Sequence, residues 1–102
     1  MKMTKNGMKR EDKSAKLNYL DYLDPHVLER YARHMKKGEL AHGRGNWKKG
    51  GYPLEEYLES AFRHFVALWA NFERSRTLRP GDEDHAAALL FNVIAFMREG
   101  GR

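Results

Sequence analysis

Residues 85–97 read HAAALLFNVIAFM, and this stretch decides the fold. From Ala86 to Met97, Asn92 is the one polar side chain. A helix that is apolar on every side is a buried helix, so we expect neighbours all around it. Asp82 is the expected N-cap, with Glu83 and Asp84 in the first turn, where the helix dipole favours acids. Residues 99–101, Glu-Gly-Gly, end this predicted helix.

The segment before it carries a second helical pattern, from Pro53 to about Arg74. One apolar stripe recurs at helical spacing, and three aromatic residues widen it. The stripe consists of Leu54, Leu58, Ala61, Phe65, Leu68 and Phe72, and the aromatic residues are Tyr57, Phe62 and Trp69. Residues 74–81 break the pattern, so the two helices are expected to form an antiparallel pair.

A third helix is predicted over residues 25–37. Asp24 is its N-cap and Pro25 its first helical residue. Lys36 and Lys37 suit the negative end of the helix dipole, and Gly38 is a natural stop. Residues 17–23 are apolar but short, and predict either a helical turn or a strand docked on the core. Residues 38–52 contain five glycines and predict a long loop, which in so small a domain is usually functional or disordered.

The predicted fold class is therefore all-α, with three main helices and the first packed across the other two. One chain supplies too few neighbours for an all-apolar helix. We therefore expect a homo-oligomer that completes a four-helix-type bundle.

The chain has 102 residues, which allow one domain and one core. Its net charge of +5 is uneven: residues 1–16 carry +4, residues 17–49 carry +3 and residues 50–102 carry −2. We predict a basic, disordered tail over residues 1–16 and a single helical domain over residues 17–102. The absence of cysteine excludes disulfides and thiol chemistry, and no apolar run is long enough for a membrane. A cytoplasmic protein is expected.

Glu55, Glu56 and Glu59 form the first candidate site. Residues three or four apart share a helical face, so two of these carboxylates project together. Mg²⁺ takes carboxylate oxygens, waters and substrate phosphates, and such a pair is half of a site for it. The alternative is a solvated acidic face in which Glu59 pairs with Arg63.

Residues 42–50 form the second candidate, a glycine-rich basic loop. Arg44, Lys48 and Lys49 offer charged donors to phosphate, and glycines permit close backbone approach. Trp47 either stacks on a base or anchors the loop to the core. The loop lacks the spacing of a phosphate-binding Walker A loop, and a flexible basic loop is the alternative.

His85 and Asn92 form the third candidate. They are seven residues, or about two turns, apart and share a face. A buried amide needs partners, and these are a nucleotide, the backbone of a helix or a symmetry-related copy of the chain. His85 is a ligand-binding residue or a residue of the first-turn surface, whereas His64, in mid-helix, favours a packed and hydrogen-bonded histidine.

Together these segments resemble a phage-associated family described as the N-terminal domain of dATP/dGTP diphosphohydrolase, near the all-α nucleoside triphosphate pyrophosphohydrolases of the MazG type. The matching segments are residues 23–25, Gly38, residues 43–50, residues 63–65 before Trp69, and residues 85–92. Two departures stand out. Gly45 separates Arg44 from Asn46, and Ala88 stands where the family has a second histidine and MazG-type enzymes have a metal-binding aspartate.

The resemblance implies a phage-encoded, Mg²⁺- or Mn²⁺-dependent pyrophosphohydrolase acting on purine deoxynucleoside triphosphates. Its implied catalytic residues are Glu56 and Glu59, and its implied metal ligands are Glu55, Glu56, Glu59 and Asp84, with Glu83 as a substitute. The implied substrate-binding residues are Arg44, Asn46, Trp47, Lys48, Lys49, Arg63, His64, His85 and Asn92. Because half of the acidic set is missing, a non-catalytic binder of nucleotides or nucleotide signals is the alternative. A nucleic-acid-binding accessory protein that uses the basic tail ranks third.

Overall fold

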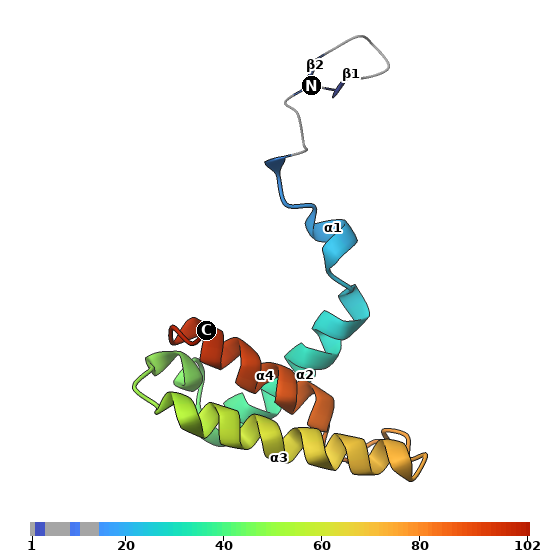
Figure 1. Ribbon diagram of the computed structural model, residues 1–102, viewed down its shortest axis with the longest axis vertical. Helices are drawn as coiled ribbons and strands as arrows, with labels where there is room; N and C mark the ends of the chain where they lie inside the picture. Colours follow the sequence, from blue (N-terminus) through green and yellow to red (C-terminus); the bar gives the residue numbers. More distant parts are fainter. Residues whose placement is uncertain (1, 4–8, 11–14) are drawn as a thin grey trace.

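The computed structural model describes residues 2–3, 9–10 and 15–102. From residue 15 onward the chain is helical and contains no strand, which confirms the all-α prediction for that part. The helices are α1 (Tyr19–Tyr22), α2 (Pro25–His42), the 3-10 helix η2 (Asn46–Lys49), α3 (Leu54–Glu73) and α4 (His85–Arg98). Two-residue strands β1 (Lys2–Met3) and β2 (Lys9–Arg10) pair antiparallel (Figure 1).

α3 and α4 form the predicted antiparallel pair (Figure 1). The buried apolar residues are Tyr57 of α3 and Ala87, Ala88 and Ala95 of α4. Small side chains let two helices approach closely, because the contacting residues set the distance between helix axes. The core of the chain is therefore a narrow seam of alanines. Among the described residues, no large side chain is fully buried.

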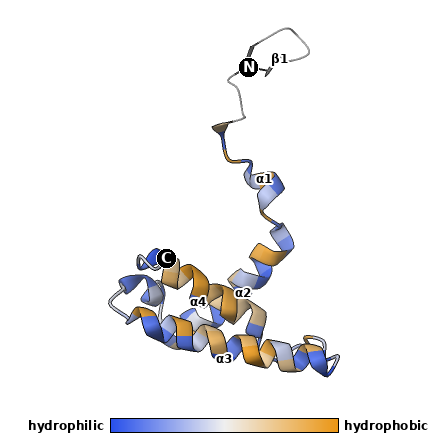
Figure 2. Cartoon of the chain, viewed as in Figure 1, coloured by the Kyte–Doolittle hydropathy of each residue, from blue (hydrophilic) through white to orange (hydrophobic). Residues whose placement is uncertain are grey.

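One chain does not cover α4 on every side, in agreement with the expectation that a single chain supplies too few neighbours for this helix. Val93 is 43% exposed and Met97 is 66% exposed. Figure 2 shows hydrophobic residues along most of α4, whereas α3 alternates hydrophobic and hydrophilic segments. The residues around α4 are too few to enclose it, because α2 and α3 contact only part of its circumference.

α2 runs through Gly38, so the predicted end of this helix at residue 37 is wrong. A glycine inside a helix costs roughly 1 kcal/mol, which a helix of this length can absorb. Gly43 ends α2 instead, and its φ of +95° explains why glycine stands there. The middle of α2 contacts α4, where the rings of His34 and Phe91 lie 6.3 Å apart.

The long loop predicted over residues 38–52 is also corrected. Residues 38–42 belong to α2, and η2 occupies much of the remainder. Trp47 of η2 packs edge-on against Phe91 of α4, with ring centroids 5.6 Å apart. The aromatic contact explains the order of this segment, which composition alone did not predict.

α4 begins later than predicted. Asp84, not Asp82, is the N-cap, and its carboxylate accepts a hydrogen bond from the Ala87 N–H at 3.1 Å. Asp82 instead holds the preceding turn, where it accepts hydrogen bonds from the backbone N–H and Nε of Arg79.

Residues 17–23 form a helical turn at α1 rather than a strand, and they do not dock on the core. Leu20 is 93% exposed, and Tyr19 and Tyr22 are exposed as well. The predicted tail, residues 1–16, lies largely outside the described residues. No helix in the described part of the chain is long and apolar enough to cross a membrane.

Candidate functional site

Three helices meet where α4 begins, and we call this meeting point the α4 junction. It comprises Arg30 of α2, His64 of α3, and Glu83, Asp84 and His85 at the start of α4. The turn at residues 74–84 brings the start of α4 back beside the middle of α3 (Figure 1).

Asp84 and Arg30 lock the start of α4 to α2. Arg30 donates from Nε and Nη2 to the two carboxylate oxygens, at 2.6 and 2.7 Å. This bidentate geometry is the strongest form of arginine–carboxylate pairing. The hydrogen bonds from Arg30 lower the pKa of Asp84 against the opposing effect of burial. Asp84 is therefore ionised at neutral pH, with both oxygens occupied.

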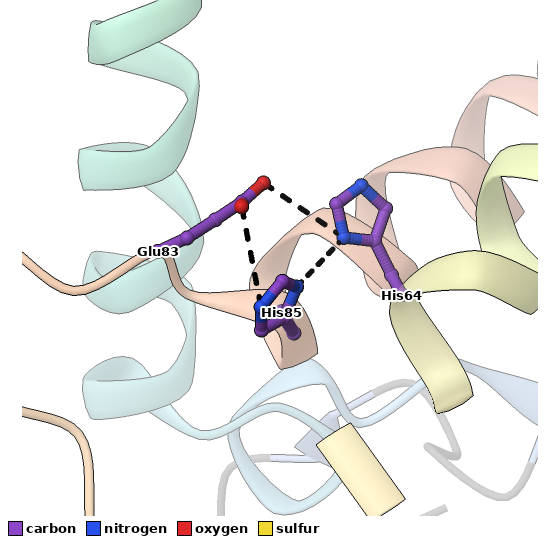
Figure 3. Close-up of side chains that lie close together, drawn as sticks. All are labelled: His64, Glu83 and His85. Carbon is purple, nitrogen blue, oxygen red and sulfur yellow. Dashed lines mark hydrogen bonds and ion pairs between the residues drawn. The ribbon is translucent and has the colours of Figure 1, made fainter. Parts of the chain in front are cut away.

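His64 and His85 face each other across the α3–α4 seam. Their Nδ1 atoms are 3.0 Å apart, and Glu83 reaches both rings (Figure 3). Glu83 Oε1 lies 3.9 Å from Nδ1 of His64, and Oε2 lies 4.0 Å from Nε2 of His85. Burial lowers the pKa of His64, and this effect exceeds the opposite one of Glu83. A hydrogen bond in which one Nδ1 donates its N–H and the other Nδ1 accepts with its lone pair explains the short distance between the rings.

Two hollows adjoin the junction. A groove of about 760 Å³ lies between α2 and residues 78–84, and a hollow of about 450 Å³ lies between the end of α3 and the start of α4. Both volumes fall in the range of small-molecule sites. The first is lined by Arg30, Arg33, Lys36 and Lys37 of α2. In the second, Arg76, Arg79 and Arg30 are matched by Asp82, Glu83 and Asp84, so only the first has a net positive lining that can oppose an anionic ligand.

The predicted substrate-binding residues divide between two places. His64 and His85 come together at the junction, although the sequence favoured only a packed role for His64. Arg63 is exposed on α3 beside His64. Asn92 is 4% exposed and donates from Nδ2 to the Ala88 carbonyl at 2.9 Å. The buried amide therefore bonds the backbone of its own helix, one of the predicted alternatives.

The glycine-rich segment lies at the opposite end of the helical pair. We call residues 44–59 together with Arg98 the loop end. Trp47 anchors it, because its ring contacts Phe91 and lies 5.5 Å from the Arg98 guanidinium and 5.6 Å from Lys48 Nζ. Arg44, Asn46, Lys48 and Lys49 are exposed there, and none of them lines either hollow.

The four predicted metal ligands are not gathered within one chain. Glu55, Glu56 and Glu59 are exposed in the first turns of α3, at the loop end. Asp84 lies at the junction, beside His64, which is five residues beyond Glu59 and thus about 7.5 Å further along the axis. Asp84 is also occupied by Arg30. One chain thus offers Mg²⁺ only the half-site of α3, and among the described residues Glu59 forms no ion pair with Arg63.

Sequence reasoning missed Arg30 and gave Glu83 only as a substitute ligand. Arg30 is 54 residues from Asp84, and no local pattern links the two. The sequence offered no signal for this pair, because Asp84 was predicted to lie in the first turn of the helix and not at its N-cap. The mixed cluster of His64, Glu83 and His85 is the one group of three potential metal ligands found among the described residues.

Comparison with known protein families gives one match. The profile of the family described as dATP/dGTP diphosphohydrolase, N-terminal, matches residues 4–100. The chain belongs to this family. No curated protein and no solved structure matches it significantly. The match spans both the loop end and the α4 junction, so the two sets of candidate residues belong to one family unit.

Proposed function

We propose that the protein is a Mg²⁺-dependent nucleoside triphosphate pyrophosphohydrolase that acts on purine deoxynucleotides. We further propose that a phage encodes it and that it works in the cytoplasm of the host cell. The observation that carries this proposal is the family match over residues 4–100. The groove of about 760 Å³ supports it, since its arginine and lysine side chains suit phosphate. Mn²⁺ is expected to replace Mg²⁺, because both ions accept carboxylate and water ligands.

The roles of the residues follow their positions. Glu55, Glu56 and Glu59 would hold the metal, which supplies Lewis-acid polarisation of the phosphates and an activated water when bound. Arg44, Lys48 and Lys49 would neutralise phosphate charge beside them, with Asn46 and Trp47 shaping the approach. Arg63, His64, His85 and Asn92 would contact the substrate from the junction side.

A second copy of the chain would complete the site. Exposed apolar side chains lie along α3, among them Phe62 at 68%, Phe65 at 49% and Phe72 at 78% exposure. Contiguous apolar faces of this kind mark association surfaces. α3 is about 30 Å long, and a two-fold antiparallel contact along it would bring the loop end of one protomer beside the end of α3 of its partner, where the hollow of about 450 Å³ lies.

The dimer is tested by sedimentation. Phe62→Glu places a charge in the proposed interface and should give monomers, because an unpaired charge there is strongly unfavourable. Leu40→Glu, at a position 78% exposed near the end of α2, is the matched control and should keep the wild-type size. A wild-type chain that is monomeric throughout the micromolar range would contradict the proposal.

The activity is tested by pyrophosphate release from dATP, dGTP, dCTP and dTTP with Mg²⁺ or Mn²⁺. Glu56→Gln and Glu59→Gln should each reduce turnover at least 100-fold, roughly what loss of a positioned catalytic group costs. Glu39→Gln, an exposed glutamate of α2, should leave turnover unchanged. Purine nucleotides should be hydrolysed faster than pyrimidine nucleotides. Folded protein with no turnover on any of the four would reject the enzyme.

A non-catalytic nucleotide binder is the second candidate. The separation of Asp84 from Glu55, Glu56 and Glu59 favours it, because it leaves one chain without a complete carboxylate set. Binding that survives chelation, with the nucleotide recovered intact, would identify this function. Nucleic-acid binding through residues 1–16 is the third candidate, and deletion of those residues together with a salt titration tests it.

A further inference from the structure

The cluster of His64, Glu83 and His85 has a composition that magnesium chemistry does not explain. It contains two imidazoles and one carboxylate, drawn from α3, from the start of α4 and from the residue before its N-cap (Figure 3). It also lies apart from the acidic half-site, since Glu59 and His64 are separated by about 7.5 Å along α3. Magnesium and calcium favour oxygen donors, whereas imidazole suits zinc, copper, nickel and iron.

The distances fit one ion. One donor atom from each residue can be chosen so that all three lie within 4.8 Å of one another. The two histidine nitrogens are 3.0 Å apart. Two nitrogen ligands at 2.0–2.1 Å from a tetrahedral zinc ion are roughly 3.4 Å apart, so the rings need to separate by only a few tenths of an ångström.

The surroundings supply the other requirements of a site. The side chains of His64 and His85 are each 21% exposed, so both are partly buried and still accessible to an ion. Glu83 is exposed and can move its carboxylate toward an ion without disturbing a hydrogen bond. Glu83 and His85 line the 450 Å³ hollow, which leaves a fourth position for water or an anion.

We propose that His64, His85 and Glu83 bind one divalent transition-metal ion of the zinc class and thereby clip the start of α4 to the middle of α3. This gives the two histidines a different role from the substrate-binding role that the family resemblance implies. The proposal does not rest on the proposed function, because ion binding is measured without any nucleotide.

The test is titration of the metal-free full-length chain with Zn²⁺ by calorimetry and with Co²⁺ by visible absorption. We expect one ion per chain and the d–d bands of a four-coordinate nitrogen–oxygen site. His64→Ala and His85→Ala should each weaken binding at least tenfold, about the smallest loss expected when a ligand is removed. His42→Ala, at the exposed end of α2, should bind as the wild type does.

The variant Glu83→Gln shows whether a loss of Zn²⁺ binding comes from removing a ligand or from unfolding the chain. Glu83 is exposed and neither caps a helix nor packs in the core, so this variant should keep its circular dichroism spectrum and still bind Zn²⁺ at least tenfold more weakly. Bound Zn²⁺ should be released between pH 7 and 5, as protons compete for the histidines, and should resist a hundredfold excess of Mg²⁺.

Several results would overturn the proposal. They are a wild type that binds no zinc, equal binding by wild type and the His64 or His85 variants, or displacement of Zn²⁺ by an equal concentration of Mg²⁺. Failure of pyrophosphate release alone would bear on the proposed function and leave this site unaffected.

Discussion

The two ends of the α3–α4 pair are built in opposite ways. At the loop end the charged groups lie within residues 44–59 and are largely exposed, with the ring of Trp47 as the anchor. At the α4 junction the contacts join residues up to 54 positions apart, and they include a bidentate ion pair and a histidine pair. Residue spacing in the sequence therefore predicts a local cluster of charged side chains such as the loop end. A cluster whose residues come from different helices, such as the α4 junction, forms only when those helices pack together.

The largest effect on stability is expected from a substitution that breaks the contacts of the α4 junction. Asp84→Ala removes the N-cap of α4 and leaves Arg30 without its carboxylate, so it should lower the free energy of unfolding by about 2 kcal/mol. Asp84→Asn keeps a capping oxygen and should lose roughly half as much. Glu59→Ala, at the loop end, should change stability by no more than about 0.5 kcal/mol. Urea unfolding at one protein concentration measures all three, and equal losses for Asp84→Ala and Glu59→Ala would erase the distinction between the two ends.

The next effect concerns the one anchored residue of the loop end. Trp47→Leu keeps apolar volume but removes the edge contact with Phe91 and the position under Arg98, and should cost about 1 kcal/mol. Lys48→Ala removes an exposed side chain over the same ring and should cost less than about 0.5 kcal/mol. The same unfolding measurement applies. A neutral Trp47→Leu would mean that the segment is not held to α4.

A smaller effect appears as pH dependence at the junction. Burial lowers the pKa of His64 and of His34 below the ordinary value of 6.5, so the unfolded chain binds protons more readily. Their contribution to stability is fully present above pH 6.5 and is lost as the pH falls below it toward the folded-state values. The lowered pKa of Asp84 acts later, and its contribution is lost as the pH falls from 3.8 through the folded-state value.

Thermal unfolding between pH 8 and 3 measures both steps. His64→Phe should flatten the first step and Asp84→Asn the second. A melting temperature that does not change between pH 7 and 5 would contradict the buried, neutral state of His64.

A small stability effect is expected between the two ends, at Asn92. Asn92→Leu leaves the Ala88 carbonyl with its helical hydrogen bond, so stability should stay within about 1 kcal/mol of the wild type. If the amide contacts a nucleoside, nucleotide affinity should fall roughly tenfold, the equivalent of one lost hydrogen bond. Calorimetric nucleotide titration distinguishes this contact from a purely helical role.

The helices themselves were largely predictable, because apolar spacing follows helical geometry. The pattern from Pro53 to Arg74 gave α3 to within a residue at each end. Gly38 misled because its cost is small inside a long helix, and the end came at Gly43, where a positive φ excludes most other residues. α4 begins after Asp84 and not after Asp82 as predicted. The carboxylate of Asp82 accepts a hydrogen bond from Arg79, and that of Asp84 accepts one from Arg30.

The candidate site was predicted only in part. Glu55, Glu56 and Glu59 share a helical segment as their spacing requires, but their proposed partner Asp84 lies elsewhere. The pairing of His64 with His85 had no sequence signal, because it depends on how two helices are set against each other.

The sequence alone predicted helices over residues 25–37, from Pro53 to about Arg74 and after Asp82, with apolar faces that exceed what one chain can cover. Those properties follow from side-chain spacing and from capping residues, which act within a few positions. The tertiary structure alone decided that Arg30 meets Asp84 and that His64, Glu83 and His85 converge. The physical reason is that the turn at residues 74–84 and the alanine seam set the register of the helices, and register brings distant residues into contact.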